Sequence, residues 1–375
     1  MAADAYEFWL TTDAGVRIQL LDETLWLAAG RQVNNIGSFS MGLPNTFDTD
    51  LVKPDRMVQV WRAPQGGRLA LWRVYFVRWW RWETQDSDEV FTIGGPDCND
   101  LLRRRIVAAY SASSQARKTD YADDMMKEAV SEALLDSADP TPSAGTRVWG
   151  DLSVQADLED GPTLTKSFAW RRLLLPSGGG VLPSIAQAAR EAGTEVFFDV
   201  VPDDVGSAGI TFEFRTYTGQ PGRDVTGLGV LFDQERGNLK DPFLEYDYTE
   251  EVNYVYAAGQ GTQDDRNVQQ VYDAGRYLAS KWGRCEGFAD ARNEASDDGV
   301  REAGRAGLEA GRPRRRFGGI PLDTRGTRFG RDWDIGYKVR ARYRGQEFDA
   351  IVGAVTISVD EDGREDIQAR LEYEG

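Results

Sequence analysis

Short stretches that alternate between apolar and polar residues dominate the first hundred positions of the chain. These stretches are residues 7–11, 16–20, 38–42, 57–62 and 90–94. Turn-forming residues such as Gly15, Pro44 and Asn45 separate them. Alternation with a period of two is typical of strands that bury one face, so this part of the chain is predicted to form antiparallel β-structure.

A longer apolar and aromatic stretch, residues 69–83, is interleaved with arginines and predicts one long strand. It carries four tryptophans, Trp72, Trp79, Trp80 and Trp82, which fall on both faces of a strand. Burial against a second sheet would account for them. A subunit interface is the functional interpretation, because large aromatic residues are enriched at interfaces.

The middle third of the chain changes to a helical period. Helices are expected at residues 97–109, 121–135 and 182–192, a loop at 136–150, and strands at 196–201 and 210–215. The first helix has an apolar stripe of Leu101, Leu102 and Ile106, and Asp97 or Asn99 can cap it. This third therefore predicts an α+β insertion.

Alternation returns in the last third of the chain. Strands are expected at residues 253–258, 337–343, 350–359 and 367–373. Residues 264–311 are rich in Ala, Glu, Arg and Asp and are predicted to be helical. The predicted fold class is mainly β with an α+β insertion.

Composition narrows the function classes. The chain of 375 residues has a formal net charge of -17, which disfavours sequence-specific DNA binding. Cys98 and Cys285 lack the spacing of a zinc site or a disulfide framework, so buried thiols are expected. Residues 1–9 show no signal-peptide pattern, and the chain is expected to fold in the cytoplasm where it is made.

Candidate chemistry is sparse. Histidine is absent, which removes histidine-based general bases, catalytic triads and most transition-metal sites. Carboxylate-only hydrolysis needs just two acids, and the acidic clusters at 157–160 and 360–362 are the candidates, although both are typical of solvated turns. Gly178–Gly180 is not followed by the lysine of a phosphate loop. No catalysis, cofactor or metal is predicted.

Two basic clusters stand out from the acidic background. They are Arg103, Arg104 and Arg105, and a stretch from 312 to 331 that contains Arg314, Arg315 and Arg316. A helix end and a solvated loop would account for them. The functional interpretation is that these arginines contact acidic surfaces of neighbouring subunits, or DNA that passes nearby.

Several ordered segments together resemble the tail hub proteins of long-tailed phages, the siphovirus relatives of the contractile-tail baseplate hub. The segment at 91–106, a strand, two glycines and a leucine–arginine helix, is the most specific. The others are residues 35–44, 55–62, 224–226, 253–261, 284–292 and 334–339. Tyr337 departs from the family pattern, which has an acidic residue at this point.

The resemblance implies two small tail-tube-like β-barrels in a baseplate-hub-like architecture. The first would comprise residues 1–100, completed by strands around 206–260, and the second residues 206–375 with embedded helices at about 264–311. Residues 101–205 would form the α+β insertion.

The resemblance also implies a homotrimer at the tail tip of the virion. It would connect the tail tube and tape measure to a distal tail protein and receptor-binding or fibre proteins, and form part of the DNA exit channel. The alternatives are a carboxylate-dependent glycan hydrolase and a non-catalytic carbohydrate-binding module, for which the tryptophans at 79–82 would be the sugar platform.

Overall fold

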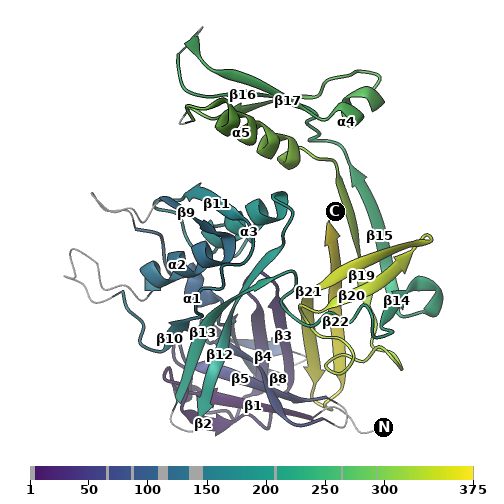
Figure 1. Cartoon of the computed structure of the whole chain (residues 1–375). Helices are drawn as coiled ribbons and strands as arrows, with labels where there is room; N and C mark the ends of the chain where they lie inside the picture. Colours follow the sequence, from purple (N-terminus) through teal and green to yellow (C-terminus); the bar gives the residue numbers. More distant parts are fainter. Residues whose placement is uncertain are drawn as a thin grey trace. The chain divides into compact units, whose positions relative to one another are not determined.

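The computed structural model describes residues 5–64, 67–85, 88–108, 117–134, 147–206, 209–262, 265–292 and 294–374. It divides into two compact units. Unit 1 comprises residues up to 189, 195–242 and 318–372, and unit 2 comprises residues 190–194, 243–317 and those from 373 onward. The fold is mainly β, as the alternation of the sequence predicts, with few helices (Figure 1).

A four-stranded antiparallel sheet forms from the first third of the chain. Its order is β2 (Arg17–Leu20), β1 (Ala5–Thr11), β5 (Met57–Ala63) and β6 (Ala70–Phe76). The first three strands confirm predictions from the alternating pattern.

A larger sheet joins the two ends of the sequence. Its order is β15 (Leu239–Asp247), β19 (Arg314–Pro321), β22 (Glu365–Glu374), β21 (Gln346–Asp360), β3 (Trp26–Gln32), β4 (Ser38–Pro44), β8 (Asp88–Pro96) and β7 (Trp79–Gln85). β20 (Lys338–Tyr343) pairs with β21, and β14 (Leu231–Asp233) pairs with β20. The antiparallel pairing of β3 with β21 brings Ala28 opposite Ser358, so segments more than 300 positions apart form one layer.

The single long strand expected at 69–83 is wrong, because the chain leaves one sheet and enters another within it. β6 belongs to the four-stranded sheet and β7 to the larger one. At the transition the N–H of Val77 donates to the carbonyl of Arg56 (2.7 Å), and that of Arg78 donates to the carbonyl of Gly94 (2.9 Å). β-forming residues lie on both sides of this change of sheet, so the sequence pattern does not indicate where one strand ends and the next begins.

The middle third of the chain is α+β within the described residues, as the sequence predicts. It comprises β9 (Arg117–Tyr121), α2 (Ala122–Leu134), β10 (Leu152–Val154), β11 (Thr163–Ser167), α3 (Val181–Glu191), β12 (Val196–Gly206) and β13 (Gly209–Thr218). Its sheets have the orders β10-β13-β12 and β11-β9. Residues 135–146, which contain most of the expected loop, lie outside the described residues.

The helix expected at 97–109 is much shorter, since α1 spans only Asp100–Arg103. Beyond it the backbone pairs with the segment at 170–173: the N–H of Val107 donates to the carbonyl of Arg171 (2.8 Å), and that of Leu173 to the carbonyl of Arg105 (3.2 Å). This long-range pairing replaces the helical hydrogen bonds. Ala109 lies outside the described residues.

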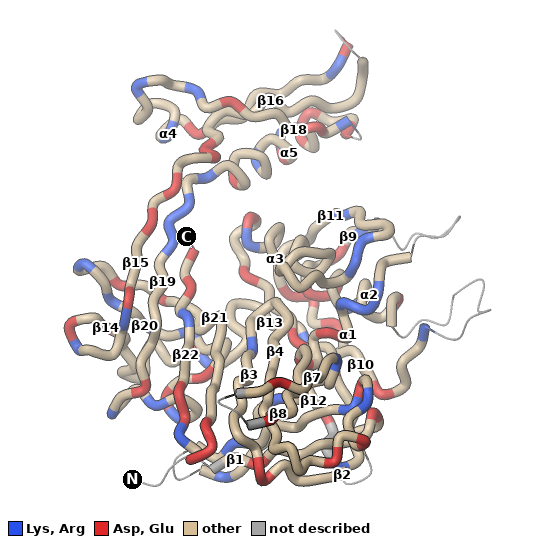
Figure 2. Tube along the Cα trace, turned by 180° about the vertical axis from the view of Figure 1, so that it is seen from behind, with Lys and Arg blue, Asp and Glu red and all other residues tan. Residues whose placement is uncertain are grey.

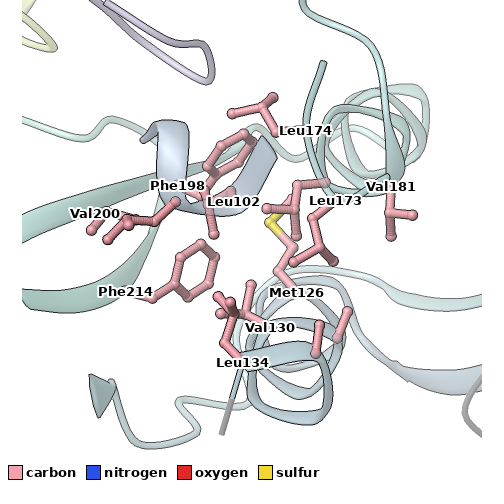
Figure 3. Close-up of a cluster of buried hydrophobic side chains, with 14 of the residues drawn as sticks. Leu102, Met126, Val130, Leu134, Leu173, Leu174, Val181, Phe198, Val200 and Phe214 are labelled. Atoms are coloured by element: carbon pink, nitrogen blue, oxygen red, sulfur yellow. The ribbon is translucent and has the colours of Figure 1, made fainter. Parts of the chain in front are cut away.

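A continuous apolar core lies between the insertion and the strands of unit 1 (Figure 3). Met126 and Val130 of α2 face Phe198 and Phe214 of β12 and β13, and all four side chains are buried. The same cluster includes Val74 and Phe76 of β6. The insertion therefore shares its core with the β-framework.

Unit 2 contains a small sheet with a helix on one face. Its elements are β16 (Tyr254–Ala258), β17 (Val268–Tyr272), α4 (Ala274–Ala279), β18 (Glu286–Asp290) and α5 (Asp297–Ala310). The expectation that residues 264–311 are helical is thus wrong for β17 and β18. Both are five-residue strands, too short to show against the helix-forming composition around them. Two 3-10 helices, Thr49–Leu51 and Gln234–Arg236, lie in unit 1.

Small residues let α5 approach this sheet closely. A Cβ atom at Gly304 would lie 2.6 Å from Val271 Cγ2, which is inside van der Waals contact. Ser296 caps the helix by accepting a hydrogen bond from the N–H of Gly299 (3.1 Å). The resulting core is small and centres on Ala257, Ala291 and Val300.

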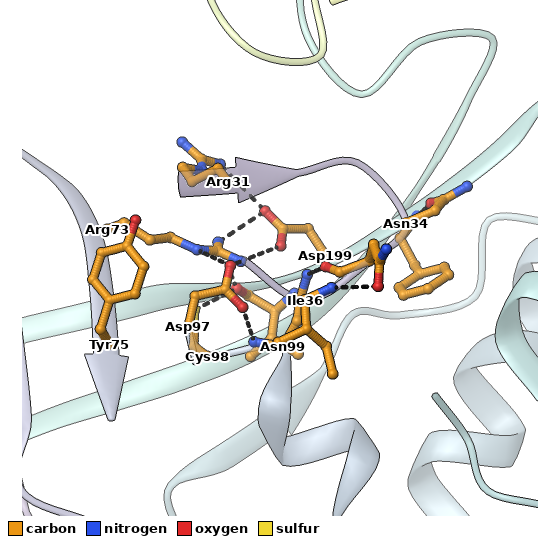
Figure 4. Close-up of polar contacts among 12 residues, drawn as sticks. Arg31, Asn34, Ile36, Arg73, Tyr75, Asp97, Cys98, Asn99 and Asp199 are labelled. Atoms are coloured by element: carbon orange, nitrogen blue, oxygen red, sulfur yellow. Dashed lines mark hydrogen bonds and ion pairs between the residues drawn. The ribbon is translucent and has the colours of Figure 1, made fainter. Parts of the chain in front are cut away.

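A buried arginine connects three segments of unit 1 (Figure 4). Arg73 of β6 donates through Nε (2.9 Å) and Nη2 (2.6 Å) to Asp97 Oδ2, and through Nη2 to Asp199 Oδ1 of β12 (2.8 Å). Arg73 and Asp97 are both buried. Asn99 extends the network, because its Oδ1 accepts from the N–H of Val200 (2.7 Å) and its Nδ2 donates to the carbonyl of Asn35 (2.7 Å).

We predict that Asp97→Ala lowers the free energy of unfolding of unit 1 by about 3–5 kcal/mol, because Arg73 would lose two hydrogen bonds while remaining buried. Urea denaturation of the full chain, followed by circular dichroism, measures the change. Asp203→Ala is the control, since Asp203 forms an exposed pair with Arg215 (3.3 Å) and should change the value by less than about 0.5 kcal/mol. Equal midpoints for the two variants would contradict the prediction.

We predict a similar loss for Phe198→Ala, about 3–5 kcal/mol, because truncation of a fully buried ring leaves a cavity in the shared core. The same denaturation measurement applies, with exposed Leu228→Ala as the control. A small effect at Phe198 would mean that the core collapses around the missing ring.

Candidate assembly surface

Three tryptophans are exposed on β7, the strand at one end of the larger sheet. Trp79, Trp80 and Trp82 are 41%, 43% and 51% exposed. β7 pairs with β8 on one side and is the last strand of the sheet among the described residues. Its other edge therefore presents unpaired backbone groups next to aromatic side chains, a combination that favours pairing with another chain.

One glycine gives the ring of Trp79 room to lie against the neighbouring strand. Trp79 lies opposite Gly94 of β8, and a Cβ atom at Gly94 would lie 2.2 Å from the Trp79 ring. The absence of a side chain at Gly94 is therefore what allows the ring to lie there. The guanidinium of Arg81 lies over the Trp79 ring, 5.6 Å from the ring centroid.

The other two rings extend the apolar face of the sheet beyond its last covered strand. Trp80 and Trp82 lie opposite Ile93 and Phe91, both of which are buried. The ring centroids of Trp82 and Phe91 are 4.8 Å apart. A neighbouring layer that continued the core would cover Trp80 and Trp82.

Trp72 lies apart from these three, on β6 of the other sheet. It is half-buried, its carbonyl accepts from Arg31 Nη1 (3.4 Å), and the Arg31 guanidinium is 5.8 Å from its ring. The structure therefore places Trp79, Trp80 and Trp82 on one edge strand, with Trp79 on the face opposite to the other two, and Trp72 on another sheet.

The first arginine cluster makes contacts within the chain. Asp100 accepts from Arg103 Nε (2.5 Å) and Arg104 Nε (2.8 Å), and Arg104 also pairs with Asp55 (2.8 Å). Arg105 lies over the ring of Trp149 at 4.2 Å. Burial, then the charges of Arg147 and Arg104, lower the pKa of Arg105.

An open groove of about 560 Å³ brings Arg103 and Trp79 together. Its lining includes Ala28, Gly95 and Thr356, which lie on β3, β8 and β21 of the larger sheet. The sequence did not predict this groove, because its lining comes from strands that are far apart along the chain.

The second arginine cluster lies on β19 in unit 2. Arg316 pairs with Glu245 of β15 (3.3 Å), and both Arg314 (3.7 Å) and Arg316 (3.9 Å) lie near Glu374 of β22. Arg315 lies 5.9 Å from the ring of Tyr373. Basic and acidic residues thus face one another on adjacent strands (Figure 2), so the cluster is partly neutralised within the chain.

The acidic clusters weighed for hydrolysis form turns. The N–H groups of Glu159 and Asp160 donate to Asp124 and Asp123 of α2 (both 3.0 Å). At the other cluster, Gly363 has a φ of +73° and its N–H donates to the carbonyl of Asp360 (2.9 Å), so this cluster forms the hairpin turn between β21 and β22.

The described residues contain no group of three or more acidic or cysteine side chains placed to hold a metal ion. Cys98 is buried as expected, and burial raises the pKa of its thiol, whereas Cys285 is only half-buried. No helix in the described part of the chain is long and apolar enough to cross a membrane.

The fold resembles two solved phage tail proteins over nearly the full length of each chain. The tail protein from Neisseria meningitidis MC58 is 12% identical, with a TM-score of 0.53, and the alignment covers 98% of this chain and 97% of that one. The 43 kDa tail protein of prophage MuSo2 from Shewanella oneidensis is 12% identical, with a TM-score of 0.52 and coverage of 97% and 98%. At this identity the likeness establishes a common fold.

No curated protein matches the sequence. A family model does match, the Siphovirus ReqiPepy6 Gp37-like protein family, over residues 17–371. This match confirms the resemblance to siphovirus tail proteins found in the ordered segments of the sequence. The chain belongs to the Siphovirus ReqiPepy6 Gp37-like protein family.

Proposed function

We propose that this chain is the hub of a siphovirus tail tip. In this role it forms a homotrimer, connects the tail tube and tape measure to the receptor-binding apparatus, and lines part of the channel through which DNA leaves. The observation that carries the proposal is the exposed tryptophan edge of β7, at the end of the larger sheet. Membership of the siphovirus family and the fold of phage tail proteins support it.

The domain organisation belongs to the same proposal. Residues 1–100 and 206–375 contribute two tail-tube-like barrels, and residues 101–205 form the insertion between them. The shared core under α2 and α3 supports a rigid attachment of the insertion to the framework. A hub needs such rigidity, because it holds neighbouring proteins in fixed positions.

We include all the candidate tryptophans and arginines in the interface of the proposed trimer, and they differ in how much each contributes to the contact. Trp79, Trp80 and Trp82 contribute most, because they are exposed and lie beside unpaired backbone. Arg103 contributes next to Trp79 in the groove. Trp72, Arg104, Arg105 and Arg314–Arg316 make contacts within the chain and act mainly by supporting their surroundings.

The exposure of the three tryptophans also favours one alternative, a non-catalytic carbohydrate-binding module. Exposed indole rings provide flat apolar surfaces on which a sugar ring can stack. The two functions differ in what covers the rings, which is a second protein chain in a hub and a glycan in a binding module.

We predict that replacing both Trp80 and Trp82 by Ser weakens trimer formation by at least about 30-fold, because each is a large aromatic at the centre of the proposed contact. Analytical ultracentrifugation of the full chain over a range of concentrations measures the change, and incorporation into tails of a phage lacking the wild-type protein measures its consequence.

Trp170→Ser is the matched control, because Trp170 is also exposed but lies in a turn outside β7. It should leave both assembly and incorporation unchanged. A stable monomeric wild-type chain that does not associate with tails would overturn the hub. Loss of glycan binding, without any change of mass, would favour the carbohydrate-binding module.

A further inference from the structure

β17 is an open edge of the small sheet in unit 2. The strand order is β17-β16-β18, and β17 pairs with β16 alone among the described residues. Asn267 and Asp273, on either side of β17, are hydrogen-bonded toward β16: the carbonyl of Asn267 accepts from Gly259 (2.7 Å), and the N–H of Asp273 donates to the carbonyl of Asn253 (3.0 Å). Because such bonds alternate along an antiparallel strand, the backbone groups of Val268, Gln270 and Tyr272 point away from β16.

This edge lacks the features that normally protect an edge strand. Edge strands usually carry charges, proline or a bulge, which prevent pairing with other chains. β17 reads Val-Gln-Gln-Val-Tyr, without charge or proline, and its pairing with β16 is regular. By contrast, the edge strand β15 contains Lys240, Asp241 and Pro242.

The side chains of β17 also leave apolar surface uncovered. Val268 and Tyr272 are 49% and 54% exposed, on the face of the sheet opposite α5. Tyr272 stacks on Tyr254 of β16, with ring centroids 5.4 Å apart and an interplanar angle of 7°. The hydroxyl of Tyr254 also donates to Gln270 Oε1, so the strand offers unpaired backbone groups beside two ordered side chains.

We propose that β17 binds the β17 strand of a second copy of this chain, in antiparallel pairing centred on Gln270. In this register Gln270 faces Gln270 of the partner subunit, and Val268 faces Tyr272 of the partner subunit. An aromatic residue beside a β-branched one is a favourable cross-strand pair, and two glutamine amides can bond to each other. At the ends of the pairing, Asn267 faces Asp273 of the partner subunit, so no like charges meet.

The opposite edge of the same sheet shows why β17 is the strand that pairs. An antiparallel pairing of β18 centred on Phe288 would place Glu286 opposite Asp290 of the partner subunit, and Arg284 opposite Arg292 of the partner subunit. Like charges directly opposite one another are destabilising. The charge pattern therefore disfavours self-pairing of β18 in that register and permits it at β17.

The joined sheet would contain six strands, with Tyr254 and Tyr272 of both copies on its face opposite α5. The contact is separate from the tryptophan edge of β7, because β17 lies in unit 2 and β7 in unit 1. The inference therefore does not depend on the proposed trimer. If both contacts form, the β17 pairing joins two of the proposed trimers, each of which is a ring of three chains.

Charge-swapped variants of the full chain test the pairing. Gln270→Lys and Gln270→Glu each place two like charges opposite one another at the centre of the contact. We expect either variant alone to have half the mass of the wild-type assembly by analytical ultracentrifugation, whatever the size of the ring. An equimolar mixture of the two should restore the wild-type mass, because Lys then faces Glu.

Phe288→Lys is the matched control, since it adds the same charge on the same face of the sheet but at the β18 edge, and it should keep the wild-type mass. Restoration by mixing also shows that both variants are folded. The proposal is overturned if Gln270→Lys and Gln270→Glu keep the wild-type mass, or if both are halved and mixing does not restore it. The mass of Gln270→Lys alone reports the ring size and so tests the trimer independently.

Discussion

The ion pair between Arg73 and Asp97, extended to Asp199, is the interaction on which the arrangement of unit 1 depends. A guanidinium that is removed from water must have its donors satisfied, since an unpaired buried charge costs several kcal/mol. Here the acceptors come from the turn after β8 and from β12. The arginine can be accommodated only when the β-framework and the insertion are both in place, so it specifies their relative register as well as stabilising it.

The apolar core beneath this network reinforces the same constraint. Phe198 and Val200 lie on either side of Asp199 along β12, and both are buried in the cluster that includes α2. Alternation along the strand therefore directs the carboxylate to Arg73 and its neighbours to the core. One strand carries both the polar and the apolar attachment, which makes the insertion part of the framework instead of a flexible appendage.

Much of the fold could be predicted from local sequence, and the failures share a physical cause. The strands and helices with clear periodicity, such as β5, α2 and α3, are present where the pattern indicates. β3 was missed because its Ala-Ala-Gly centre lacks β-forming side chains, and it exists through pairing with β4 and β21. The change of sheet at Val77 and the shortened α1 likewise depend on partners distant in the sequence.

The candidate surfaces could likewise be predicted by residue type, but not by position in the fold. The tryptophans of β7 were identifiable by residue type, but whether they would be exposed depends on β7 being the last strand, which is a property of the topology. Arg103–Arg105 and Arg314–Arg316 stood out by charge, yet several of their partners, such as Asp55 and Glu374, are far away in the sequence. The Arg73 network had no local signal, because one arginine among several in an aromatic strand gives no indication of burial.

The net charge of this chain opposes association between copies, whereas the proposed contacts require it. The distribution of charge along the chain allows both. A chain with a formal charge of -17 repels its own copies at long range. At contact distance only the local charges matter, because salt screens the rest within about 10 Å. β17 carries no charge, and the exposed part of β7 balances Arg81 against Glu83 at 3.0 Å. The acidic residues can therefore oppose nonspecific association while leaving these two edges free to pair.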